Sequence, residues 1–227
     1  MNCCNTQEQC AGLDQLFDSG TAQAELDDYV KHGPGKTTRW LLDAIRQAMR
    51  DRLQGASLLD IGGGVGVIQH ELVHAGVKEV VGVDASTAYL DTAKREAEKR
   101  GYADHASYRF GNFAELAPDI AQADVVTLER VICCYPDMRA LVQLSSERAK
   151  QVYAVVYPRD VWWMKLGRDA MNFGMRLFRR KFRFFVHPTA AVEAIVTANG
   201  FVRQFYRASW VWQVVVFQRK AQSTNRL

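Results

Sequence analysis

The chain has 227 residues, of which 48% are hydrophobic and 24% charged, and its formal net charge at pH 7 is +4. This composition indicates an ordinary folded protein and excludes long disorder, and 29 basic against 25 acidic residues is too even a balance to indicate binding to nucleic acid. The longest apolar runs, 152–157 and 214–217, are far shorter than the ~20 residues that cross a bilayer.

Residues 1–20 are predicted to form a flexible N-terminal segment. They show neither the basic nor the apolar stretch of a signal peptide, so we expect a cytoplasmic protein. Three of the five cysteines lie here, and the other two, Cys133 and Cys134, are adjacent. This spacing lacks the C-x2-C pairs of a zinc site and suits no disulfide framework, so we expect reduced thiols and no bound metal.

From residue 21 to about residue 220 the chain is predicted to form one α/β domain. Residues 21–52 favour two helices that the break at 33–35 separates, because proline lacks a donor and glycine relaxes the helix. Helices over 67–75 and 86–100 then alternate with strands over 57–61, 79–83, 107–110, 124–128 and 151–157. Such alternation is typical of a mostly parallel sheet with helices on both faces. The last two strands, 201–206 and 209–219, leave no room for a crossover helix and should pair antiparallel.

The most informative motif is the glycine-rich stretch that follows the first strand, Asp60-Ile61-Gly62-Gly63-Gly64-Val65-Gly66. Glycines allow the backbone to approach a ligand closely, although a turn without a ligand is the alternative. The dinucleotide pattern G-x-G-x-x-G fails in both registers. The stretch resembles the first motif of class I S-adenosylmethionine-dependent methyltransferases, in which an acid suits the positive charges of the cofactor. The resemblance places Asp60, Gly62 and Gly64 at S-adenosylmethionine.

Polar residues also follow the next three strands. Asp84 ends the second strand and, with the following Ala85, is expected at the ribose, although an acid here can also cap the next helix. Asn112 and Phe113 resemble the third motif of the family, which binds adenine, but Asn112 is also an ordinary turn residue. Glu129 follows the fourth strand, where such enzymes meet the methionyl portion and the substrate.

The sequence His70-Glu71-Leu72-Val73-His74 matches the H-E-x-x-H pattern of zinc proteases. It lies on the helix that the glycine loop starts, and nothing nearby supplies a third ligand. We interpret the match as a coincidence and expect both histidines on the polar side of that helix.

Beyond these motifs, the chain from about Asp28 resembles the magnesium-protoporphyrin IX O-methyltransferase group. The resemblance rests on Asp28-Tyr29, Arg39-Trp40, Ile132-Cys133-Cys134-Tyr135-Pro136 and Phe185-Val186-His187-Pro188. It implies a Rossmann-like fold with a seven-stranded, mostly parallel sheet and an antiparallel C-terminal strand pair. It also places Tyr29 and Arg39 at the cofactor, with Arg39 meeting its carboxylate.

In that group a tyrosine and a histidine are the suspected catalytic pair, and here they become Tyr29 and Cys134. An unperturbed thiol has a pKa of about 8.5 and is mostly protonated near pH 7, so it is a weaker base than a neutral imidazole. A small buried apolar residue is the alternative for Cys134.

The segment 161–185 combines seven basic residues and one acid with an apolar helical stripe. The stripe comprises Trp163, Leu166, Ala170, Phe173 and Leu177. This segment is predicted to cap an anionic substrate, to lie on an acidic membrane surface, or to be a solvated basic face.

Together these features predict a methyltransferase that moves a methyl group from S-adenosylmethionine to a small molecule, with oxygen as the favoured acceptor atom. The expected acceptor is an apolar or aromatic scaffold that carries negative charge. Sulfur or nitrogen methylation is an alternative, as is a protein that binds the cofactor without chemistry. The sequence indicates no oligomeric state.

Overall fold

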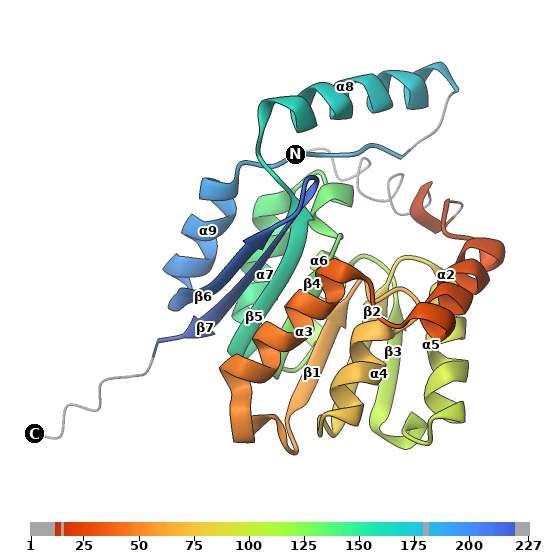
Figure 1. The fold of residues 1–227 in the computed structure, drawn as a ribbon, viewed down its shortest axis with the longest axis vertical. Coiled ribbons are helices and arrows are strands. Elements are labelled where there is room, and N and C mark those ends of the chain that lie inside the picture. Colours follow the sequence, from red (N-terminus) through yellow and green to blue (C-terminus); the bar gives the residue numbers. More distant parts are fainter. Residues whose placement is uncertain (1–11, 15, 179–181, 221–227) are drawn as a thin grey trace, which may run out of the picture.

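Seven strands form one sheet in the computed structural model, which describes residues 12–14, 16–178 and 182–220. Their order across the sheet is β3-β2-β1-β4-β5-β7-β6 (Figure 1). The strands are β1 (Ser57–Ile61), β2 (Glu79–Asp84), β3 (Ala106–Phe110), β4 (Ala123–Glu129), β5 (Ala149–Pro158), β6 (Phe201–Ala208) and β7 (Trp212–Arg219). The first five run parallel, and β7 is antiparallel to both β5 and β6, which confirms the predicted sheet.

Helices cover both faces of the sheet. In the described residues the α-helices are α2 (Ser19–His32), α3 (Lys36–Met49), α4 (Val67–His74), α5 (Thr87–Lys99), α6 (Phe113–Leu116), α7 (Met138–Glu147), α8 (Trp162–Leu177) and α9 (Thr189–Ala198). Short 3-10 helices occupy η1 (Arg50–Leu53), η2 (Ala103–His105), η3 (Ala117–Asp119) and η4 (Ile132–Cys134). The predicted break between the first two helices is confirmed at Gly33–Gly35.

Strand β5 is buried on both faces and shows why this sheet needs two layers of helices. Its buried residues alternate between the two faces. Val152, Ala154 and Val156 pack in one cluster with the buried side of α3. Tyr153, Val155 and Tyr157 pack in the other cluster, with α7 and α9. A strand that is apolar on both sides is stable only when both faces are covered.

The strand order also determines where a ligand can bind. β1 lies between β2 and β4, so the chain leaves β1 in one direction along the sheet and returns on the other side. In open α/β sheets, ligands bind at the carboxyl ends of the strands where the order reverses in this way. The predicted residues Gly62, Asp84, Asn112 and Glu129 lie at or just after the ends of β1, β2, β3 and β4, at this edge.

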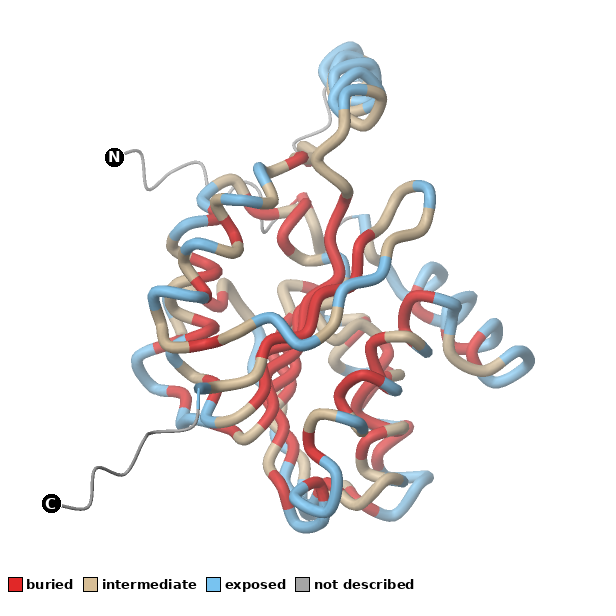
Figure 2. The backbone as a smooth tube through the Cα atoms, turned by 60° about the vertical axis from the view of Figure 1, so that its left-hand side comes forward, coloured by how far each residue is buried: buried red, intermediate tan, exposed pale blue. Residues whose placement is uncertain are grey.

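Two segments lie outside this layered body. Helix α8 contains no buried residue and is the pale blue helix at the top of Figure 2. On the N-terminal side, the Asp14 carboxylate accepts the Thr87 amide at 2.9 Å, and the Phe17 ring stacks on Tyr89 at 5.3 Å. These contacts hold the described part of segment 1–20 against α5, and the flexibility predicted for this segment stays a prediction. Cys3, Cys4 and Cys10 lie outside the described residues.

None of the helices in the described part of the chain is both long and apolar enough to span a bilayer.

Candidate cofactor and active site

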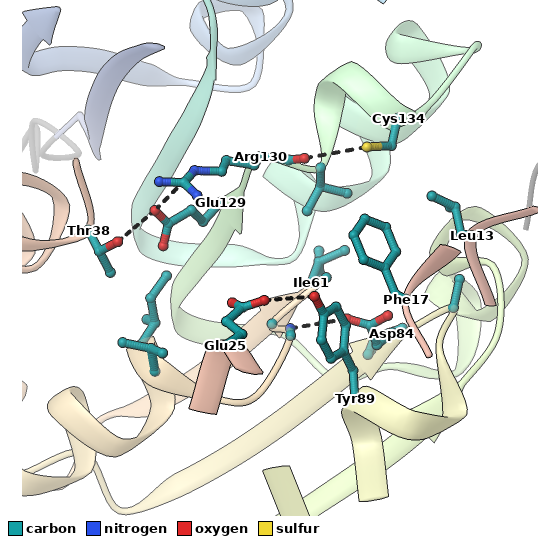
Figure 3. Close-up of a pocket in the computed structure, with 18 of the residues that line it drawn as sticks. Leu13, Phe17, Glu25, Thr38, Ile61, Asp84, Tyr89, Glu129, Arg130 and Cys134 are labelled. Carbon is teal, nitrogen blue, oxygen red and sulfur yellow. Dashed lines mark hydrogen bonds and ion pairs between the residues drawn. The ribbon is translucent and has the colours of Figure 1, made fainter. Parts of the chain in front are cut away.

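A cavity of about 520 Å³ opens at the carboxyl ends of the strands (Figure 3). It brings together most of the residues that the sequence pointed to. The predicted residues in its wall are Tyr29, Gly62, Gly64, Asp84, Ala85, Asn112, Phe113, Glu129 and Cys134. Arg39 and Asp60 are not among the residues that line it.

The glycine loop forms one wall of the cavity because its backbone has a shape that side chains would prevent. Gly62 and Gly64 have φ angles of 65° and 55°, in the left-handed region that favours glycine. A Cβ atom on Gly62 would also collide with the side chain of Val131. The Gly64 amide donates a hydrogen bond to Asp84 at 3.1 Å, so the loop is tied to the end of β2.

Asp60 supports this loop from below instead of facing the cavity. Its side chain is fully buried, and its carboxylate accepts hydrogen bonds from the Thr127 hydroxyl at 2.6 Å and the Gln69 amide at 3.1 Å. A Cβ atom on Gly63 would collide with this carboxylate. Burial raises the pKa of Asp60. The direct cofactor contact expected of Asp60 is therefore corrected to a role beneath the loop.

Asp84 is the acid that faces the cavity. Its carboxylate accepts the amides of Gly64 and Ser86, the latter at 2.9 Å, and lies at the end of β2 (Figure 3). The hydroxyl of Ser86, and not Asp84, caps α5 by accepting the Tyr89 amide. Burial raises the pKa of Asp84 to about 6, against the effect of these amide hydrogen bonds. A carboxylate whose charge is disfavoured by burial gains from further donors such as ribose hydroxyls.

Next to Asp84, the wall of the cavity is formed by three residues that were not predicted from the sequence. The Tyr89 hydroxyl donates to Glu25 at 2.7 Å, and Phe17 stacks on the Tyr89 ring (Figure 3). Glu25, Phe17 and Tyr89 all line the cavity. Glu25 lies one helical turn before Tyr29, and this spacing could have indicated it.

Asn112 and Phe113, the two residues expected at adenine, line the cavity, and Asn112 also stabilises the local structure. The Asn112 amide oxygen accepts the Tyr135 hydroxyl at 2.7 Å and the Ala114 amide at 3.2 Å, so Asn112 caps the short helix α6. Its amide nitrogen donates to Glu115 at 3.0 Å. The turn alternative for Asn112 is thus present in the structure, while Phe113 is buried beside it in the cavity wall.

Glu129 and Arg130 form the wall after β4. The Thr38 hydroxyl donates to Glu129 at 2.8 Å, and burial raises the pKa of Glu129. The Arg130 guanidinium lies 3.9 Å from Glu129 and 5.2 Å from the centre of the Trp212 ring. Arg39, by contrast, is exposed and outside the wall. Arg130, which was not predicted from the sequence, lines the cavity instead.

The expected catalytic pair, Tyr29 and Cys134, lies in the wall of one cavity. The Tyr29 hydroxyl donates to Glu71 at 3.1 Å, and burial together with this carboxylate raises the pKa of Tyr29 to about 12. Cys134 Sγ lies 3.6 Å from the Arg130 carbonyl and 3.7 Å from Cys133 Sγ. Because the Tyr29 hydroxyl is engaged by Glu71, the structure favours a positioning role for this residue, and the catalytic roles of both stay predictions.

The histidines of the H-E-x-x-H match do not share the polar side of their helix. His70 is buried, with Nδ1 at 2.5 Å from the Tyr102 hydroxyl and Nε2 at 3.1 Å from the Val65 carbonyl, whereas His74 is exposed. Burial lowers the pKa of His70 to about 4. The expectation for His70 was therefore wrong, because α4 turns this side of the motif towards Tyr29 and Tyr102. The described residues contain no group of three or more His, Cys, Asp or Glu placed to hold a metal ion.

The apolar stripe of the segment 161–185 does not roof the cavity. None of Trp163, Leu166, Ala170, Phe173 and Leu177 lines it, and Leu13 and Phe17 occupy the wall instead. Arg176 is exposed on α8, while Arg179, Arg180 and Lys181 lie outside the described residues.

The fold and the cavity together define a class of protein. Residues 58–151, which contain β1, β2, β3, β4 and the glycine loop, match the family model of the methyltransferase domain. The chain therefore carries a domain of the class I S-adenosylmethionine-dependent methyltransferases, and S-adenosylmethionine is the cofactor of that class.

Individual relatives agree with this class. A ribosomal protein L11 methyltransferase of Alteromonas mediterranea is 30% identical over 166 residues, which cover 67% of this chain and 54% of the relative. The chain thus spans about half the length of this curated relative. Among solved structures, magnesium protoporphyrin IX methyltransferase from Synechocystis PCC 6803 with bound SAH superposes with a TM-score of 0.70 at 19% identity, over 93% of this chain and 100% of the other. An O-methyltransferase family protein from Burkholderia thailandensis superposes with a TM-score of 0.65 at 14% identity, over 90% of this chain and 61% of the other.

Proposed function

We propose that this protein transfers the methyl group of S-adenosylmethionine to an oxygen atom of a small molecule. The observation that carries the proposal is the hydrogen bond between the Gly64 amide and Asp84 inside a cavity of about 520 Å³ at the edge where the strand order reverses. This hydrogen bond joins the glycine loop, whose backbone a ligand can approach closely, to the carboxylate of Asp84. The loop and the carboxylate both suit a ligand made of an amino acid and a nucleoside.

The charges in the wall fit the cofactor of the class. Four acids line the cavity, Glu25, Asp28, Asp84 and Glu129, and they suit a ligand that bears an ammonium and a sulfonium. Arg130 supplies a cation for the carboxylate of the amino-acid portion.

Each wall residue then has a specific role. Asp84, beside Ala85, would accept the ribose hydroxyls, Phe113 would pack on adenine, and Glu129 would meet the ammonium group. S-adenosylmethionine, when bound, supplies an electrophilic methyl group whose transfer leaves the electron pair of the broken bond on sulfur. The protein mainly has to hold the reacting atoms in line and exclude water, an effect worth up to ~7–11 kcal/mol in favourable cases.

The proposed oxygen acceptor rests on the likeness in fold to an O-methyltransferase family protein. A base is needed when a neutral hydroxyl is methylated. An acceptor that is already ionised, such as a carboxylate, needs no base. An apolar or aromatic scaffold on the acceptor would agree with the aromatic side chains of Phe17 and Tyr135 in the wall.

Transfer of a labelled methyl group from S-adenosylmethionine to a panel of carboxylates, phenols, thiols and amines tests the proposal. We expect label on a carboxylate or phenol. Label only on thiols or amines would contradict the oxygen acceptor, and label only on a ribosomal protein would favour the acceptor type named for the Alteromonas relative. Cofactor binding without turnover on the full panel would favour a non-catalytic binding protein.

Charge reversal at Arg179 and Arg180 tests the negative charge of the acceptor. These residues stand in the basic stretch of the sequence that follows α8. We expect Arg179→Glu with Arg180→Glu to raise the apparent KM for an acidic acceptor and to leave cofactor affinity unchanged. An unchanged KM would show that these two arginines do not bind the negative charge of the acceptor.

A further inference from the structure

Helix α8 turns its apolar face away from the body of the protein. The side chains of Trp162, Leu166, Phe173 and Leu177 are 64–72% exposed, and at 100° per residue they fall on one side of the helix. We refer to these four residues as the α8 face. Because a surface helix normally packs its apolar side on the core, this orientation is the reverse of the usual one.

Polar contacts hold α8 in this orientation. The Asn172 side chain donates to the Phe184 carbonyl at 2.8 Å and accepts the Phe184 amide at 2.9 Å. The next residue, Phe185, donates its amide to the Cys133 carbonyl at 2.7 Å. The helix therefore faces the protein with its Asn172 side, and the chain that returns beneath it is attached to η4.

Two further aromatic side chains near the ends of α8 are exposed. Phe178 follows the last turn of the helix and is exposed. Trp210, in the turn between β6 and β7, is also exposed, and its ring stacks on Trp163 at 5.4 Å. Large exposed apolar surfaces mark interaction sites.

The same segment carries a strong positive charge. Residues 161–185 contain seven basic side chains and one acid, a net charge of +6. Lys165 pairs with Asp160 at 2.8 Å and Arg168 pairs with Asp169 at 2.8 Å. Arg176, in the last turn of α8, is exposed and forms no ion pair within the described part of the chain.

We propose that α8 binds in the interface of an anionic lipid bilayer, with the α8 face among the acyl chains and the basic side chains of α8, Lys165, Arg168 and Arg176, at the headgroups. Tryptophan and phenylalanine on an apolar face flanked by arginine and lysine are the features of helices that lie in this interface. The anionic surface of a membrane complements the charge of +6. A second copy of the chain would instead bring two such basic segments together, and like charges would oppose that contact.

Flotation with lipid vesicles tests this proposal independently of methyl transfer. We expect the full chain to float with vesicles of phosphatidylcholine and phosphatidylglycerol, but not with phosphatidylcholine alone, and to be released as the salt concentration rises. Phe173→Ser with Leu177→Ser should lower binding at least about tenfold, and Arg176→Glu should lower it roughly tenfold.

Two matched controls separate the α8 face from general effects. Lys94→Glu, on the exposed side of α5, changes the net charge as much as Arg176→Glu does, and Val30→Ser removes an exposed apolar side chain from α2. Both should bind vesicles as the wild type does. Circular dichroism should show that every variant folds, because all the changed side chains are exposed.

Three results would overturn the proposal. They are a wild type that does not float with anionic vesicles, an α8 variant that floats as well as the wild type, and controls that bind as weakly as the α8 variants. A lipid-free dimer that Phe173→Ser and Leu177→Ser convert to monomer, without vesicle binding by the wild type, would assign the α8 face to a second copy instead.

Discussion

Two carboxylates beside the glycine loop have different roles because their surroundings differ. Asp60 lies near the end of β1 and Asp84 ends β2. Asp60 is hydrogen-bonded to Thr127 and Gln69 beneath the loop, whereas Asp84 faces the cavity. The sequence placed both at the cofactor. Which of two nearby acids faces a ligand depends on side-chain packing, and a pattern of residue types carries no information on that.

The raised pKa of Asp84 predicts a pH dependence of cofactor binding. Ribose hydroxyls donate best to the ionised carboxylate, and the pKa of the free protein's Asp84 is about 6. As the pH falls through 6, the proton competes with the ligand, so the Kd for S-adenosylhomocysteine should rise, by up to about tenfold per pH unit. Calorimetry between pH 5 and 8 measures this slope. Asp84→Asn should abolish it, and an unaltered slope in that variant would assign the titration to another group.

Tyr29 provides a second test at this scale. Its hydroxyl donates to Glu71, so Tyr29→Phe removes a hydrogen bond to a charged group and should lower the free energy of unfolding by ~1.5–3 kcal/mol. If the residue only positions the wall, the turnover rate should stay within a few-fold. Denaturant unfolding and single-turnover kinetics on the same variant separate the two effects. A large loss of rate with unchanged stability would restore the catalytic role expected from the sequence.

Cys134 is tested by Cys134→Ser. A residue that only packs against the Arg130 carbonyl and Cys133 tolerates an exchange of sulfur for oxygen, so turnover should stay within a few-fold and stability should fall modestly. The measurement is kcat together with the melting temperature. Should most of the rate disappear in a folded variant that binds cofactor normally, Cys134 acts in the chemistry.

At the scale of elements, the glycine loop joins β1 to α4 and depends on its backbone shape. Gly64 has a φ of 55°, and a Cβ atom there would meet Glu25 only at 3.5 Å, an ordinary contact. Gly64→Ala should therefore introduce strain of about 1 kcal/mol or more without a large collision. Because the strain falls on a cavity wall, we expect weaker cofactor binding in a protein that still folds. Calorimetry and thermal unfolding measure both, and unchanged affinity would show that the loop does not contact the ligand.

Elements whose signal is local were predicted well from the sequence. The glycine loop, the break at Gly33–Gly35 and the apolar run of β5 are recorded in neighbouring residues, so their types and positions follow from propensity and periodicity. The orientation of α8 could not be predicted in this way. Its stripe is visible at helical spacing, but only the tertiary structure shows that Leu166, Phe173 and Leu177 are exposed. Trp163 of the same stripe stacks on Trp210.

At the scale of the whole molecule, the alternation of strands and helices predicted the mostly parallel sheet. The cover of the cavity was not predictable, because it joins segments far apart in the chain. Phe17 comes from a segment that composition indicated to be flexible, and it lies against Tyr89 of α5. Arg130 lines the cavity and has a φ of 61°. Its guanidinium lies over the ring of Trp212 in β7. Such contacts arise from the tertiary fold alone.

The central claim, that this cavity is an S-adenosylmethionine site built around Asp84, is tested most directly by calorimetric titration of the wild type and Asp84→Ala with S-adenosylmethionine and S-adenosylhomocysteine. The wild type should bind both ligands. Loss of charge-assisted hydrogen bonds to the ribose, each worth ~1.5–3 kcal/mol, should weaken both in the variant by about tenfold or more. A folded wild type that binds neither ligand, or equal affinities in the two proteins, would contradict the claim.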